Sequence, residues 1–212
     1  MAKALIFDFD GVIVLSEQAR FDAIQKLAQR YGVEIPHELF RDIIGRTTQD
    51  FFALSLPDLG PGVLKEILNA LQHEYGDKII DHVTPVAATT EFIRTYSGTR
   101  KLAVASSSGV VVLKTLLKHL GIFDKFACIV GKEHVAKHKP DPEVYTLTAS
   151  QLGCSPQDCI VIEDTVVGAQ AAINAGMSVY ILLNGVNSKV EFENVNASGF
   201  LETTEQIRQA VT

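Results

Sequence analysis

The chain has 212 residues, and 47% of them are hydrophobic, which is enough for a substantial buried core and too many for a disordered protein. Its formal net charge of −6 argues against nucleic acid as the main partner, since proteins that bind nucleic acid usually carry a basic surface. No apolar run reaches the length of a membrane-spanning helix or of a secretory signal, so we expect a cytoplasmic protein without a membrane partner.

The first predicted strand covers residues 4–9 and runs into the acidic stretch DFDG, which begins at Asp8. Helical patterns then follow over residues 15–80. The clearest of them lies at residues 62–75, where leucine and isoleucine recur at the spacing of one helix face. This whole early part of the chain is therefore predicted to be helical.

Four further apolar runs alternate with helical patterns in the rest of the chain. They are KLAVA at 101–105, FACIV at 126–130, CIVIE at 159–163 and SVYILL at 178–183. Near-continuous apolar strands separated by helices are typical of a parallel sheet that is covered on both faces. We therefore predict an α/β protein with a Rossmann-like, doubly wound parallel sheet. Its core domain would comprise residues 1–14 and 82–212, and residues 15–81 would form an inserted, all-helical domain.

Polar side chains follow four of the predicted strands, in the region where an open parallel sheet binds its ligands. They are Asp8 and Asp10 after the first strand, Ser106 and Ser107 after KLAVA, Lys139 after FACIV, and Glu163 and Asp164 at the end of CIVIE. Carboxylates that gather at one point repel one another, and a cation relieves that repulsion. Asp8, Glu163 and Asp164 suit an oxygen site for Mg²⁺, and Lys139 would neutralise Asp8 and a bound phosphate. Together these residues predict a site for phosphoryl transfer.

Each of these segments, taken alone, also has a purely structural interpretation. Serines after a strand are good helix N-caps, and an acidic pair stabilises the first turn of the helix that follows it. Lys139 lies in the basic stretch KEHVAKHKP, which is typical of a solvated loop. The combination of all four segments at one edge of the sheet favours a functional site.

The stretches FDFDGV, AVASSS, KHKPDPEVY and VIEDTVVGAQAAINAG resemble, in order and spacing, the motifs of the haloacid dehalogenase (HAD) superfamily. The helical insertion resembles the early cap domain of that family, with phosphoglycolate phosphatase-like and β-phosphoglucomutase-like proteins as the most similar members. The resemblance implies that Asp8 is the nucleophile and Asp10 the general acid and base. It implies phosphate binding by Ser106, Ser107 and Lys139, and Mg²⁺ binding by Asp8, the main-chain carbonyl of Asp10, Glu163 and Asp164.

The function implied by the resemblance is Mg²⁺-dependent hydrolysis of a small phosphorylated metabolite, a sugar phosphate or a phosphoglycolate-like ester, through an aspartyl-phosphate. We expect a monomer or a weak homodimer. A β-phosphoglucomutase-like mutase is the alternative, although Arg20 and Leu71 stand where that enzyme has a histidine and a lysine in its cap. A 2-haloacid dehalogenase is less favoured because such enzymes lack a second aspartate like Asp10. A non-catalytic regulatory protein is less favoured because every matched position holds the expected residue type.

Three residues of the helical insertion are candidate substrate-binding residues: Gly45, Arg46 and Arg20. In similar proteins the turn that corresponds to GRTT enters the active site when the cap closes. Arg46 would then bind a second anionic group of the substrate, and a solvated arginine is the simpler alternative. Arg20 could bind a substrate anion or could lie on an exposed helix face. A cap of this size favours a small substrate over a macromolecule.

Overall fold

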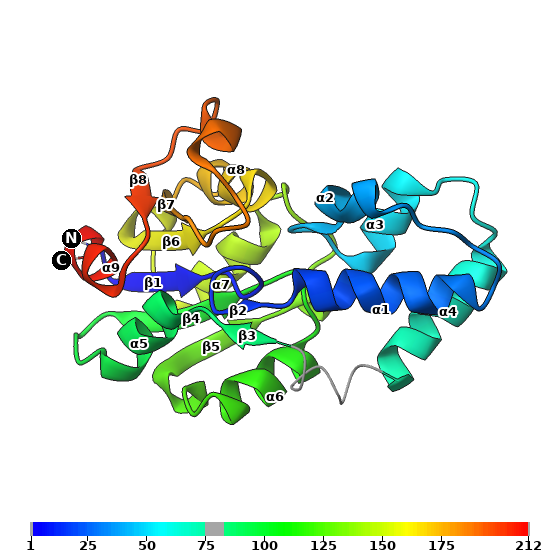
Figure 1. Ribbon diagram of the computed structural model, residues 1–212. Helices are drawn as coiled ribbons and strands as arrows, with labels where there is room; N and C mark the ends of the chain where they lie inside the picture. The colour runs from blue at the N-terminus through cyan, green and yellow to red at the C-terminus, as the bar shows by residue number, and fades with distance from the viewer. Residues whose placement is uncertain (1, 75–82, 212) are drawn as a thin grey trace.

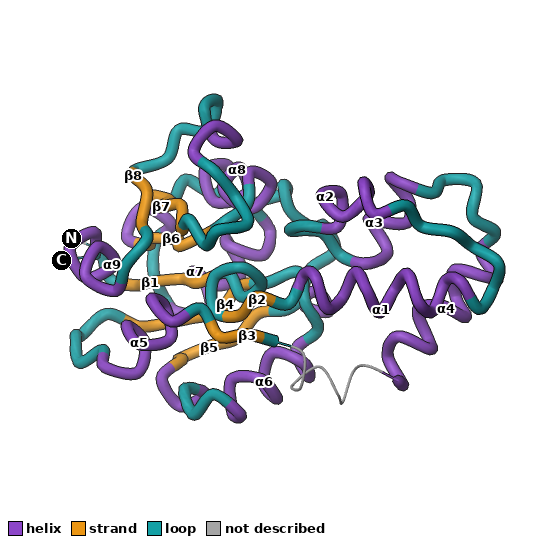
Figure 2. The backbone as a smooth tube through the Cα atoms, viewed as in Figure 1, coloured by secondary structure: helices purple, strands orange, loops and turns teal. Residues whose placement is uncertain are grey.

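The computed structural model describes residues 2–74 and 83–211. A six-stranded parallel sheet lies at the centre of the larger lobe, with the strand order β5-β4-β1-β6-β7-β8 (Figures 1 and 2). Its strands are β1 (Ala4–Phe7), β4 (Lys101–Ala105), β5 (Phe126–Val130), β6 (Cys159–Glu163), β7 (Ser178–Leu182) and β8 (Gly199–Leu201). The helices around it are α5 (Ala87–Thr95), α6 (Val110–His119), α7 (Glu143–Leu152), α8 (Val166–Asn174) and α9 (Thr204–Ala210). The predicted doubly wound α/β core is confirmed.

The central strand β1 shows why the sheet needs cover on both faces. Ala4 and Ile6 pack with residues of α7 and α8, whereas Leu5 and Phe7 pack with residues of α5, α6 and α9. All four side chains are completely buried. Successive side chains of a strand point to opposite faces, so a strand that is apolar at every position must have helices on both sides.

The helices encoded by the early insertion form a second, smaller lobe beside the sheet (Figure 1). They are α1 (Glu17–Gln29), α2 (Phe40–Ile43), α3 (Thr48–Ser55) and α4 (Pro61–Glu74). This lobe has its own buried apolar cluster, which includes Phe21, Phe51 and Ile67. None of the described helices combines the length and the apolar character that crossing a membrane requires.

The two chain segments that lead into and out of the smaller lobe lie next to each other. β2 (Val14–Leu15) pairs with β3 (Thr84–Pro85) in a short antiparallel ribbon. This ribbon lies close to both ends of the predicted insertion, residues 15–81. The predicted boundary between residues 81 and 82 lies outside the described residues.

The structure differs from the predicted elements at β1 and near the C-terminus, and it adds the short strands β2 and β3, which were not predicted. β1 ends at Phe7 instead of residue 9, because the chain turns there and the main-chain carbonyl of Phe9 accepts hydrogen bonds from the N–H groups of Ile13 and Val14. β8 and α9 have no predicted counterpart. β8 has only three residues, too few for a recognisable pattern of apolar side chains.

Candidate active site

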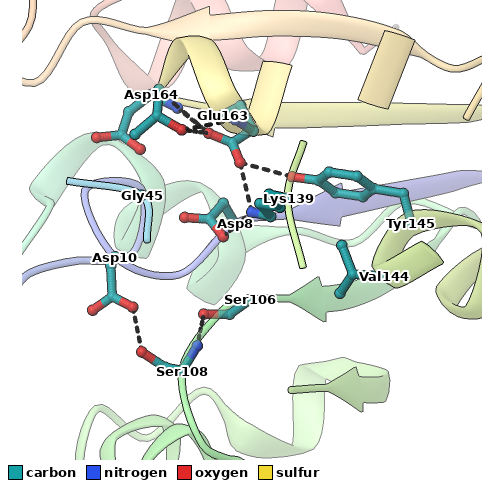
Figure 3. Close-up of polar contacts among 12 residues, drawn as sticks. Asp8, Asp10, Gly45, Ser106, Ser108, Lys139, Val144, Tyr145, Glu163 and Asp164 are labelled. Carbon is teal, nitrogen blue, oxygen red and sulfur yellow. Dashed lines mark hydrogen bonds and ion pairs between the residues drawn. The ribbon is translucent and has the colours of Figure 1, made fainter. Parts of the chain in front are cut away.

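The central place of β1 brings the predicted site residues together. β1 lies between β4 and β6, so the segments that follow these three strands are neighbours at one edge of the sheet. Asp8 follows β1, Ser106 follows β4 and Glu163 ends β6. Figure 3 shows these side chains gathered at one place together with Lys139, which comes from the segment between β5 and α7.

Lys139 connects two of the acidic residues at the centre of this group. Its Nζ lies 2.6 Å from Asp8 Oδ1 and 2.6 Å from Glu163 Oε1, and all three side chains are buried. Burial alone would lower the pKa of Lys139, but the carboxylates of Asp8 and Glu163 outweigh that effect and hold it well above its usual value. Lys139 is therefore a permanent buried cation. Most other residues of its sequence stretch are exposed, so the solvated-loop interpretation fails for Lys139 alone.

Glu163 is held in place by hydrogen bonds to both of its carboxylate oxygens. Oε1 accepts from Lys139 Nζ and, at 2.8 Å, from the hydroxyl of Tyr145. Oε2 accepts from the main-chain N–H groups of Asp164 and Thr165 and from the hydroxyl of Thr165, all at 2.9–3.0 Å. Burial opposes ionisation of Glu163, but Lys139 and these donors outweigh it and lower its pKa. Tyr145 was not predicted, although it lies within the stretch KHKPDPEVY.

Asp164 differs from Glu163 because one of its oxygens has no partner. Its Oδ1 is buried and accepts no hydrogen bond, whereas Oδ2 accepts from the side-chain amide of Asn184 at 2.9 Å. Gly11, with φ of +81°, provides the space for this carboxylate, since a Cβ there would lie 1.9 Å from Asp164 Oδ2. No sequence pattern indicated Asn184, which lies in the loop after β7.

Asp8, Glu163 and Asp164 each offer an oxygen within 4.8 Å of the others, so they could hold a metal ion together. Burial, followed by the charge of Glu163, raises the pKa of Asp164 well above its usual value. Burial likewise raises the pKa of Asp8, although Lys139 opposes that effect. A divalent cation would reverse both shifts, and oxygen ligands are those that Mg²⁺ prefers. The unpartnered buried Oδ1 of Asp164 fits such an ion.

Asp10 has its own set of partners. Its carboxylate accepts a hydrogen bond from the hydroxyl of Ser108 at 2.6 Å (Figure 3). It also accepts one from the hydroxyl of Ser16. Because β1 ends at Phe7, the alternation of a strand does not extend from Asp8 to Asp10.

The serines after β4 lie at different depths. Ser106 is buried, and its Oγ accepts a hydrogen bond from the N–H of Ser108 at 3.0 Å. Ser107 and Ser108 line a cleft of about 480 Å³ between the two lobes. The cleft is also lined by Ala19, Arg20, Ala23, Thr47, Thr48, Gln49, Leu68, Asn69, Leu71, Gln72, Gly109, Val112, Lys132 and His138.

The two candidate arginines of the smaller lobe are engaged within that lobe. Arg20 borders the cleft, but its guanidinium NH2 lies 2.5 Å from Glu17 Oε2 and also donates to the carbonyl of Ile43, while NH1 donates to that of Arg46. Only its Nε lacks a partner. Arg46 donates to the carbonyl of Asp42 and is not among the residues that line the cleft. The exposed-helix interpretation of Arg20 is therefore wrong.

Gly45 lies where the smaller lobe approaches the sheet. It has a φ of +71°, and a Cβ at this position would lie 3.0 Å from Thr165 Oγ1, just beyond β6. Its N–H donates to Glu17 Oε1 at 3.4 Å. Gly45 therefore lies close to the core beside Thr165, and its role in binding substrate stays a prediction.

Comparison with known proteins shows the family of this chain. Residues 5–182 match the family model described as haloacid dehalogenase-like hydrolase. The chain belongs to that family. The YhcW protein of Bacillus subtilis (strain 168) is 33% identical over 92% of this chain and 89% of its own length.

Other members of the haloacid dehalogenase-like family are also similar to this chain. Fructose-1-phosphate phosphatase YqaB of Escherichia coli (strain K12) is 32% identical over 82% of the chain and 92% of its own length. The crystal structure of β-phosphoglucomutase from Clostridium difficile superposes with a TM-score of 0.81 at 25% identity, covering 98% of this chain and 93% of that one. The resemblance seen in the sequence motifs is confirmed.

Proposed function

We propose that this family member is a Mg²⁺-dependent phosphatase that hydrolyses a small phosphorylated metabolite. The observation that carries the proposal is the buried carboxylate of Asp8, which belongs to the acidic cluster and is paired with Lys139 at 2.6 Å. Ser107 and Ser108, which follow the neighbouring strand β4, border the cleft. The similarity to a fructose-1-phosphate phosphatase supports a phosphate ester as substrate.

Two carboxylates are the best direct ligands for the proposed metal ion. Asp8 and Asp164 each have an oxygen that is not used in the hydrogen bonds described above, and the main-chain carbonyl of Asp10 would complete the protein's set. Glu163 has both oxygens occupied by donors, so we assign it to holding Lys139 and the start of α8. When bound, Mg²⁺ would offset the negative charges of the carboxylates and the phosphate.

The remaining steps are assigned to residues of the chain. The Asp8 carboxylate attacks phosphorus, and the bond to the alcohol oxygen breaks to give an aspartyl-phosphate. Asp10 gives a proton to the departing oxygen and then takes one from the water that releases phosphate. Ser106, Ser107 and Lys139 bind the phosphoryl oxygens. Lys139 suits this role because its charge is compact and fixed by burial.

We further propose that residues 15–81 act as a cap domain over the cleft. Three observations support this. These residues have a separate apolar cluster, the strands β2 and β3 pair where the chain enters and leaves the smaller lobe, and Gly45 lies close to Thr165. A closed cap would exclude water and strengthen each charge interaction inside. We assign Arg20 to bracing the turn at residues 43–46, with its Nε–H left as a donor toward a ligand.

A mutase similar to β-phosphoglucomutase is the second candidate, supported by the structural similarity to that enzyme. Purified protein should release phosphate from p-nitrophenyl phosphate and from a panel of sugar phosphates and phosphoglycolate with Mg²⁺, and lose activity with EDTA. Absence of hydrolysis across the panel would reject the phosphatase. Interconversion of β-glucose 1-phosphate and glucose 6-phosphate, stimulated by a bisphosphate, would favour the mutase instead.

Mg²⁺ is expected to stabilise the protein more at about pH 8 than at about pH 6, because only ionised carboxylates bind the metal. The raised pKa values of Asp8 and Asp164 mean that the metal-free fold loses stability as the pH rises through them. The unfolding temperature with and without millimolar Mg²⁺ measures the effect, and Ca²⁺ and Na⁺ serve as controls. If Mg²⁺ raised the unfolding temperature equally at both pH values, the assignment of Asp8 and Asp164 as metal ligands would be contradicted.

Replacing Asn184 with alanine is expected to weaken Mg²⁺ binding by about ten-fold or more, since residues that orient metal ligands have effects of this size. Asn184 donates to Asp164 Oδ2 and to the main-chain carbonyl of Gly11. Calorimetric titration with Mg²⁺ measures the affinity. Asn196→Ala, which changes an exposed amide in the same C-terminal segment, is the matched control. Equal affinities in the two variants would show that Asn184 does not orient Asp164.

A further inference from the structure

The side chains that line the cleft between the lobes include basic but no acidic ones, although the chain as a whole is acidic. No aspartate or glutamate is among the described residues that line the cleft. The basic residues Arg20, Lys132 and His138 do line it. The formal net charge of the chain is −6. A cleft without acidic side chains in an acidic protein favours an anionic ligand.

The cationic residues of the cleft differ in whether their charge is already balanced. The guanidinium of Arg20 forms an ion pair with Glu17 at 2.5 Å. Lys139, which lies deeper, pairs with Asp8 and Glu163. Within the described part of the chain, Lys132 forms no ion pair, and its side chain is exposed. Its charge therefore remains available to a ligand in the cleft.

Lys132 is connected to Asp10 through hydrogen bonds of Ser108. Lys132 begins the short helix η4 (Lys132–His134), and its main-chain N–H donates to the carbonyl of Ser108 at 3.1 Å. The hydroxyl of Ser108 donates to Asp10. The Lys132 side chain passes the start of α6, where its Cε would lie 3.7 Å from a Cβ at Gly109. Lys132 is thus one main-chain hydrogen bond from a residue that contacts Asp10.

The neighbouring acid, Glu133, forms no ion pair with Lys132 among the described residues and is bound to a main-chain donor. Glu133 Oε2 accepts a hydrogen bond from the N–H of Val110 at 3.1 Å, so its carboxylate caps the start of α6. Glu133 does not line the cleft.

We propose that Lys132 is a specificity residue that binds a second anionic group of the substrate, a carboxylate or a second phosphate. The inference rests on the proposed phosphatase function, because it takes the first phosphate to lie at Asp8. From the sequence, Arg46 was expected to bind this second group, but Arg46 does not line the cleft. The proposal assigns the group to Lys132 of the core domain instead.

A binding experiment tests this role without depending on turnover. The ligands are propylphosphonate, phosphonopropionate, which ends in a carboxylate, and propane bisphosphonate, which ends in a second phosphonate. Calorimetry in the presence of Mg²⁺ gives the affinity of each for the wild-type protein and for Lys132→Ala and Lys132→Arg. Lys137→Ala is the matched control, since Lys137 lies exposed in the same segment, 3.8 Å from Asp141, and does not line the cleft.

The wild-type protein should bind at least one doubly anionic ligand about ten-fold more tightly than propylphosphonate, as expected for a charge-assisted contact. Lys132→Ala should lose this preference, Lys132→Arg should keep most of it, and Lys137→Ala should keep all of it. Which doubly anionic ligand is preferred identifies the group as carboxylate or phosphate. A wild-type protein without preference, or a preference that survives in Lys132→Ala, would overturn the proposal. Absence of phosphate release from every ester would instead reject the phosphatase function.

Discussion

Asp8→Asn is expected to lower phosphatase activity by at least about 10⁴-fold, because an amide oxygen cannot take the phosphoryl group as a carboxylate does. The fold should survive the change. Asp8 is buried beside Glu163 and Asp164, and burial raises its pKa well above the usual value in the metal-free protein, so a neutral amide of the same shape removes an unfavourable charge. We expect the unfolding temperature to be unchanged or slightly higher without Mg²⁺.

Phosphate release with Mg²⁺, together with thermal unfolding of the same preparations, measures both effects of Asp8→Asn. Asp22→Asn is the matched control, because Asp22 is exposed on α1 and its carboxylate contacts the side chain of Gln18. That variant should retain full activity. Near-normal activity of Asp8→Asn would reject Asp8 as the nucleophile, whereas loss of activity together with loss of the fold would show that Asp8 is needed structurally.

Lys139→Met is expected to abolish activity and to lower the free energy of unfolding by about 3–5 kcal/mol near neutral pH, because it leaves buried carboxylates without their cation. Lys139 is the ion-pair partner of Asp8 and Glu163, and methionine has a similar volume without the charge. Denaturant unfolding measures the loss. Lys137→Met changes an exposed lysine of the same segment and should alter stability by less than about 0.5 kcal/mol.

The pH dependence of the Lys139→Met defect gives a further check. Without Lys139, the pKa values of Asp8 and Glu163 in the folded protein should rise, since the nearby positive charge lowers both. A raised pKa in the folded state means that stability is lost as the pH rises, so the deficit should be smaller at about pH 5 than at about pH 8. A deficit that does not depend on pH would indicate lost packing in place of unbalanced charge.

Much of the site follows from local features of the sequence. Apolar runs and helical spacing locate β4, β5, β6 and β7, and parallel strands must end at one edge. Polar residues directly after such strands therefore gather, as Asp8, Ser106 and Glu163 do. The positions of short elements such as β8 depend on neighbouring strands, and local sequence does not specify them.

The individual role of each polar side chain was decided by tertiary packing. Glu163 and Asp164 are adjacent in sequence and equally acidic, yet one has both oxygens occupied by donors and the other keeps a buried oxygen free. Asn184 and Tyr145 approach the site only because β7 and α7 pack against its strands. Such contacts join residues that are distant along the chain, so no local pattern records them.

The sequence alone determined the α/β class, the polar segments that accompany the predicted strands, and the membership in a family of hydrolases, because apolar periodicity and the order of motifs can be read without the fold. Only the tertiary structure decided that Lys139 is buried between two carboxylates and that Arg20 braces a turn within the smaller lobe. It also decided that Lys132 borders the cleft without an ion-pair partner among the described residues. The physical reason is that burial and charge pairing depend on which distant segments pack together.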